Sequence, residues 1–157
     1  MGRTGIKRFP GKMKNIYEKY DEQIKSGILE IQTDFSSSST VYNSDLVITD
    51  WSSIALEYSF TTKKPSLFIN TPMKVMNPDW RDIGIEPMDL WLRDKIGVSL
   101  NTDRLDETQN VVRDLLDRSS DYKAAIIDTM SEMLYNIGNA AETGGSYIIE
   151  QIKTKRQ

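Results

Sequence analysis

Short runs of apolar, often β-branched residues alternate along this chain with longer stretches that have helical spacing. The apolar runs predict strands at residues 28–32, 46–49, 67–69 and 98–100. The stretches between them repeat apolar residues every three or four positions, which is typical of amphipathic helices. Strands that alternate with helices predict the α/β class. We therefore expect a small parallel sheet of about four strands with helices on both faces.

The helical spacing also predicts where each helix lies. We expect helices over residues 13–26, from residue 54, over 88–95, 103–118 and 122–136, and from residue 146. Gly27 follows the first helix as a C-terminal stop. Residues 1–12 are basic and polar and predict a flexible lead. Residues 13–157 would then form one Rossmann-like nucleotide-binding domain, and we expect it to be truncated at its N-terminus.

The most informative stretch is the strand-to-helix turn that follows residues 46–49. Asp50 ends the strand, and Ser52 or Ser53 occupies the N-cap position of the next helix. A helix N-terminus presents free N–H groups and partial positive charge, so this turn could hold a phosphate. Glu57 lies one turn deeper and suits a sugar or polyol hydroxyl. The alternative is that the serines only cap the helix and Glu57 is solvated.

This turn resembles the signature of the CDP-glycerol glycerophosphotransferase family. The matching residues are Thr49, Asp50, Trp51, Ser52, Ser53, Lys64 and Pro65. The resemblance implies one Rossmann-like half of a two-domain GT-B enzyme that builds glycerol phosphate polymers. It also implies a CDP-glycerol-type donor, a polyol-phosphate acceptor, a missing N-terminal domain, and a location in the cytoplasm or at the inner face of the cell membrane. In this interpretation Ser52 and Ser53 donate to the diphosphate, Trp51 belongs to the binding turn, and Asp50 holds the turn.

Three residues outside the turn complete the predicted substrate site. Ser38 lies in a serine run that follows the first predicted strand, Thr71 directly follows the third, and Arg93 lies near the end of a helix. Open α/β sheets bind ligands at the carboxyl ends of their strands, so Ser38 and Thr71 could line the same crevice. Arg93 could contact the diphosphate. The serine run could equally be a linker, and Arg93 an exposed cation at a helix end.

The composition of the chain excludes several kinds of active site and partner. The chain has 157 residues, a formal net charge of -3, no cysteine and no histidine. This charge does not favour nucleic acid as a partner. Thiolate catalysis and a Ser-His-Asp triad are excluded. No acidic cluster has metal-ligand spacing, so we expect neither a metal nor another cofactor. No stretch approaches the ~20 apolar residues of a transmembrane helix.

The absence of histidine departs from the family, whose active sites use histidines. We therefore expect this chain to be a fragment without turnover, whose catalytic base comes from a missing segment. A truncated sheet leaves apolar surface uncovered, which favours self-association. Two alternatives stay open. One is a UDP-sugar-dependent glycosyltransferase or 2-epimerase-like domain. The turn is similar to that of UDP-sugar 2-epimerases, in which a Glu stands seven residues after the Asp, as Glu57 follows Asp50. The other alternative is a non-catalytic α/β interaction module.

Overall fold

The computed structural model describes residues 9–33, 39–73, 75 and 77–155. The chain divides into two compact units, Met1–Asn43 and Ser44–Gln157. The predicted domain of residues 13–157 therefore spans both units. Ser38 lies outside the described residues. No helix among the described residues is long and apolar enough to cross a membrane, and the same residues contain no cluster of three or more potential metal ligands.

The described residues of the first unit form three short helices, α2 (Pro10–Lys19), α3 (Asp21–Lys25) and α4 (Ser39–Asn43), none of which has a buried residue. Helix α2 begins at Pro10, because proline fits the first helical position, so the predicted lead is helical from residue 10. The predicted helix over residues 13–26 is interrupted at Tyr20, whose φ and ψ are -112° and 22°. Gly27 has a φ of +76° and ends this region, as its sequence position predicted.

The predicted strand at residues 28–32 is wrong. Residues 29–33 have no regular secondary structure, and the side chain of Ile28 is 83% exposed. An alternating pattern indicates a strand only where a neighbouring strand accepts its backbone hydrogen bonds. No strand of the described chain pairs with this segment. The sheet therefore has three strands, not four.

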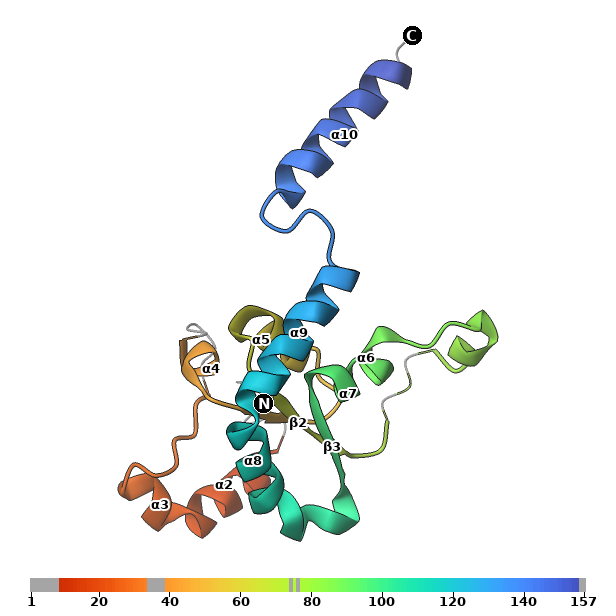
Figure 1. Ribbon diagram of the computed structural model, residues 1–157. Helices are drawn as coiled ribbons and strands as arrows, with labels where there is room; N and C mark the ends of the chain where they lie inside the picture. The colour runs from red at the N-terminus through yellow and green to blue at the C-terminus, as the bar shows by residue number, and fades with distance from the viewer. Residues whose placement is uncertain (1–8, 34–38, 74, 76, 156–157) are drawn as a thin grey trace. The chain divides into compact units, whose positions relative to one another are not determined.

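The second unit is built on a parallel sheet in the order β1-β2-β3. Its strands are β1 (Val47–Thr49), β2 (Ser66–Asn70) and β3 (Gly97–Asn101). Figure 1 shows β2 and β3 side by side. Leu67 on β2 is in register with Ile48 on β1 and Val98 on β3. The fold is thus α/β, and three of the predicted strands are confirmed.

Helices cover both faces of the central strand β2, as predicted, whereas Ile48 on the edge strand β1 is 52% exposed. Neighbouring residues of a strand point to opposite faces, and on β2 these are Leu67 and Phe68. Phe68 packs with Ala55, Leu92, Ile96 and Ile126. Ala55 belongs to α5 (Ile54–Thr62), Ile96 to α7 (Arg93–Ile96) and Ile126 to α9 (Ser119–Met133), and Leu92 directly precedes α7. Leu67 packs with Leu100 and with Leu115 from α8 (Thr108–Asp117). The core therefore consists of two apolar layers, one on each side of β2.

The remaining helices differ from the predicted ranges mainly because predicted helices are divided or begin at other residues. The segment predicted as one helix over 88–95 is two short helices, α6 (Met88–Trp91) and α7, because Leu92 separates them. A 3-10 helix, η2 (Thr102–Glu107), precedes α8, and another, η1 (Trp80–Ile83), lies in the long segment before α6. Helix α10 (Ala140–Lys155) begins six residues before the predicted start at residue 146.

Candidate functional site

The site lies where β1 and β2 end. Because parallel strands have their carboxyl ends at one edge of the sheet, residues 50–53 and 71–73 follow neighbouring strand ends. The indole Nε1–H of Trp51 donates a hydrogen bond of 2.8 Å to the backbone carbonyl of Thr71. Thr71 thus takes part in the site through its backbone. This bond joins the two strand ends and fixes the plane of the indole.

Arg93 is buried against this indole. Its guanidinium carbon lies 4.0 Å from the centre of the Trp51 ring and 4.6 Å from the centre of the Phe68 ring. The residue is only 5% exposed. Stacking on two aromatic rings suits a planar guanidinium and stabilises its charge where water is excluded. The sequence-based alternative of an exposed terminal cation is therefore wrong.

The hydrogen-bonding capacity of Arg93 is incompletely used. Its Nε and Nη2 atoms are buried and have no hydrogen-bond partner. Burial lowers the pKa of the guanidinium from its ordinary value, while the carboxylates of Asp94 and Asp50 oppose that shift. An arginine stays protonated even so. Buried unpaired donors are costly, and such a group in a native structure indicates a strained or functional position.

A small hollow of about 20 Å³ adjoins the guanidinium. It is lined by Asp50, Trp51, Ser52, Leu56, Phe68, Asp89 and Arg93. The structure thus brings four of the predicted site residues together: Asp50, Trp51, Ser52 and Arg93. A volume of this size accommodates about one water molecule. Only a single ligand oxygen could enter it without movement of the side chains, so a larger group would lie at its mouth.

The turn between β1 and α5 is less open than a free helix N-terminus. Ser53 is the N-cap residue, but its side chain makes no capping bond. The Ser52 hydroxyl instead accepts a weak 3.4 Å bond from the amide of Ile54. The amides of Ala55 and Leu56 donate to the carbonyls of Ser52 and Ser53. Within the described part of the chain, the amide N–H groups of Ser52 and Ser53 make no hydrogen bond. These two groups could donate to an anion.

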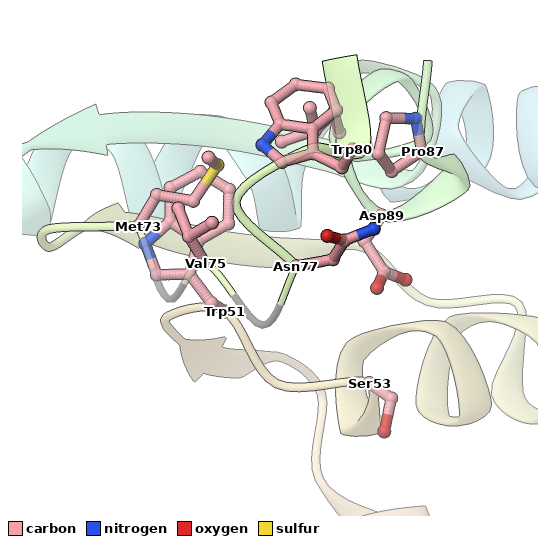
Figure 2. A pocket seen from close by; sticks show the side chains of 9 residues that line it. Trp51, Ser53, Met73, Val75, Asn77, Trp80, Pro87 and Asp89 are labelled. Carbon is pink, nitrogen blue, oxygen red and sulfur yellow. The ribbon is translucent and has the colours of Figure 1, made fainter. Parts of the chain in front are cut away.

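A larger cleft of about 480 Å³ lies next to the small hollow. Its lining residues are Trp51, Ser53, Met73, Val75, Asn77, Trp80, Pro87, Asp89 and Leu90. Figure 2 shows Trp51, Met73 and Val75 gathered together, and the Ser53 hydroxyl directed away from Asn77 and Asp89. Trp51 and Asp89 line both the cleft and the small hollow. The two spaces therefore form one composite site.

One of the predicted residues, Glu57, does not join this site. Glu57 is exposed and lines neither the hollow nor the cleft. Ser38 lies outside the described residues. Conversely, the sequence did not single out Phe68 and Asp89. Phe68 looked like an ordinary strand residue. Asp89 follows Pro87 in the first turn of α6, and that position was the signal that could have identified it.

Comparisons with protein-family models, with curated proteins and with solved structures found no match to this chain. The resemblance of the turn to the glycerophosphotransferases is therefore a hypothesis. The geometry of the site itself has to supply its support.

Proposed function

We propose that the Ser44–Gln157 unit binds the diphosphate of a CDP-glycerol-type donor. It would form the nucleotide-binding half of a glycerophosphotransferase that makes a cell-wall or capsular glycerol phosphate polymer. The observation that carries this proposal is the buried guanidinium of Arg93, whose Nε and Nη2 lack partners beside Ser52. A phosphate oxygen is an anionic acceptor and would form a strong charge-assisted hydrogen bond with an arginine at such a position.

The two carboxylates of the small hollow favour a phosphate ester over inorganic phosphate. Asp50 and Asp89 line the hollow together with Arg93. Both carboxylates are exposed at the mouth of the hollow and would repel a bare phosphate, because like charges repel one another. A donor with hydroxyl groups beside its phosphates gives each carboxylate a hydrogen-bond donor. Glycerol and ribose esters both meet this requirement.

In this proposal each group has a defined role. The N–H groups of Arg93 and the amides of Ser52 and Ser53 hold the diphosphate, while Asp50 and Asp89 accept hydroxyl protons of the donor in hydrogen bonds. An acceptor hydroxyl oxygen attacks the β-phosphorus, and a new O–P bond forms. The bond from that phosphorus to the bridging oxygen breaks, and CMP leaves with the electron pair. The hydroxyl proton passes to a base on the missing N-terminal domain.

The UDP-sugar alternative has less support. It depended on Glu57, which is exposed and lines neither space. The non-catalytic alternative predicts no specific ligand at the turn. A titration separates all three interpretations.

The test is an NMR titration of the full chain with CDP-glycerol, CMP, a UDP-sugar and inorganic phosphate. We expect CDP-glycerol to shift resonances of Trp51, Ser52 and Arg93 at sub-millimolar to millimolar concentration, and inorganic phosphate to bind more weakly. Arg93→Lys removes the Nε–H and the planar fork, so CDP-glycerol should bind about tenfold more weakly. Arg118→Lys is the matched control, because Arg118 is exposed and lines neither space.

Two outcomes contradict the proposal. One is an unchanged spectrum around Trp51 at millimolar CDP-glycerol. The other is equal affinity in the parent chain and in Arg93→Lys. A stronger response to the UDP-sugar than to CDP-glycerol would favour the UDP-sugar alternative instead.

A further inference from the structure

The two unpartnered atoms of Arg93 belong to one edge of its planar guanidinium. Nε and Nη2 carry N–H bonds that point in parallel, and this fork matches two oxygens of one carboxylate or phosphate. Arg104 shows the same fork in use, because its Nε and Nη2 each donate a 2.6 Å hydrogen bond to an oxygen of Glu107. Arg93 therefore keeps a complete bidentate donor edge without a partner.

The carboxylates beside Arg93 do not occupy this fork. Asp50 and Asp89 line the same hollow, but neither accepts a hydrogen bond from its Nε or Nη2. The exposed residues Arg104 and Arg118 differ, because both pair with carboxylates. A guanidinium that was free to turn would also be attracted by the carboxylates next to it. The guanidinium of Arg93 must therefore be held by something other than its own hydrogen bonds.

Two aromatic rings hold it. The guanidinium carbon of Arg93 lies 4.0 Å from the centre of the Trp51 ring and 4.6 Å from the centre of the Phe68 ring, which is close enough for cation–π contact. Phe68 is fixed in the core on β2, where it is 3% exposed. Trp51 lies in the turn after β1, and its indole is anchored by the 2.8 Å bond to the carbonyl of Thr71. The plane of the guanidinium thus depends on that bond.

We propose that Trp51 is a positioning residue of the proposed donor site. Its indole, held by the carbonyl of Thr71, keeps the Nε–Nη2 fork of Arg93 unpaired and available to two oxygens of one phosphate group of the donor. One of these oxygens would enter the small hollow, and the other would lie at its mouth. The ligand class rests on the proposed function, whereas the effect of Trp51 on Arg93 can be measured without a ligand.

The test replaces Trp51 in the full chain with β-(3-benzothienyl)alanine, which keeps the shape of tryptophan but has sulfur in place of the indole N–H. The first readout is the NMR signal of the Arg93 Nε–H in the ligand-free chain, assigned by its loss in Arg93→Lys. In the parent chain this signal should be shifted by the two rings and exchange slowly with water. Without the bond to Thr71 it should move toward the signal of a free arginine and exchange at least about tenfold faster.

The second readout is the affinity for CDP-glycerol. The Trp51 variant should bind it about threefold to tenfold more weakly, which is the loss expected when one hydrogen bond is removed. The same replacement at Trp91 is the matched control, because Trp91 lines neither the hollow nor the cleft. A purely structural role of Trp51 would instead lower the urea midpoint and leave the Arg93 signal and the affinity of the folded chain unchanged.

The outcomes separate this inference from the donor proposal. A parent-like Arg93 signal in the Trp51 variant overturns the positioning role, whatever CDP-glycerol does. A changed Arg93 signal with an unchanged affinity for CDP-glycerol also overturns it. If CDP-glycerol binds neither chain, the donor proposal fails, and the ligand-free signal still decides whether Trp51 positions Arg93. A changed signal together with weaker binding supports the whole inference.

Discussion

Trp51 and Arg93 form the central contact of this site, with the guanidinium carbon 4.0 Å from the centre of the indole ring. The indole is itself anchored, because its Nε1–H donates to the carbonyl of Thr71. One aromatic ring thus connects the ends of two strands to a buried cation on α7. The same ring is a wall of both the small hollow and the larger cleft.

Replacing Arg93 with methionine should lower the affinity for CDP-glycerol but change the stability of the fold only slightly. Two unpaired buried donors cost about 1–3 kcal/mol each, and the two aromatic contacts offset this by about 0.5–2 kcal/mol each. We therefore expect Arg93→Met to change the free energy of unfolding by no more than about 2 kcal/mol. The same variant should lose affinity for CDP-glycerol.

Urea denaturation and the ligand titration together test this expectation. Phe68→Ala serves as the comparison, because removing a buried aromatic ring should cost about 3–5 kcal/mol. A loss of that size in Arg93→Met would assign Arg93 a structural role instead of a binding role.

Gly97 should not tolerate a side chain. A Cβ atom at this position would lie 1.7 Å from the backbone oxygen of Ser66, the residue opposite it in the sheet. Neither backbone can move without breaking the β2–β3 pairing. We expect Gly97→Ala to lower the free energy of unfolding by at least about 3 kcal/mol, measured by urea denaturation.

Gly144→Ala is the matched control for that substitution. Gly144 lies inside α10, and a Cβ atom there would meet nothing within 4 Å. Alanine should raise the helical signal in circular dichroism, since glycine costs a helix roughly 1 kcal/mol relative to alanine. A similar loss of stability in both variants would contradict the steric argument.

The hydroxyls of Ser59 and Ser66 should behave as a coupled pair. They lie 3.0 Å apart and are fully buried, and their bond joins α5 to β2. Removing one hydroxyl leaves the other without this partner, which costs about 1–3 kcal/mol. Removing both should cost no more than either single change, because no buried hydroxyl then remains unpaired at this contact.

A double-mutant cycle with Ser59→Ala, Ser66→Ala and the double variant measures this coupling by urea denaturation. Strictly additive losses would show that the two hydroxyls act independently.

Tyr122 should make stability fall at alkaline pH. Burial raises the pKa of its phenol above the ordinary value, although the charge of Arg118 opposes the shift. Above about pH 10 the unfolded chain therefore releases this proton before the folded chain does. The unfolded state then binds fewer protons, so the free energy of unfolding decreases as pH rises.

Tyr122→Phe should flatten this decrease above about pH 10, in urea denaturation at a series of pH values. Tyr147→Phe is the control, because Tyr147 is exposed on α10. Parallel pH profiles for the parent chain and Tyr122→Phe would contradict the assignment.

The local pattern of the sequence predicted much of the second unit. The apolar runs at residues 46–49, 67–69 and 98–100 became strands that pair with one another, and the central strand β2 is buried between helices, where continuous apolar side chains are stabilised. The alternating residues 28–32 did not, because a strand also requires a paired neighbour. Helix breaks such as Leu92 were missed because apolar spacing continues across them.

The sequence by itself determined the α/β class, three parallel strands and a polar turn at the end of the first one. Those features were predictable because the spacing of apolar and polar residues within each short segment differs between strands, helices and turns. Only the tertiary structure decided that Arg93 is buried between Trp51 and Phe68. It also decided that Glu57 lies outside the site and that Asp89 belongs to it. These relationships join residues far apart in the chain, and the packing of helices on the sheet sets them.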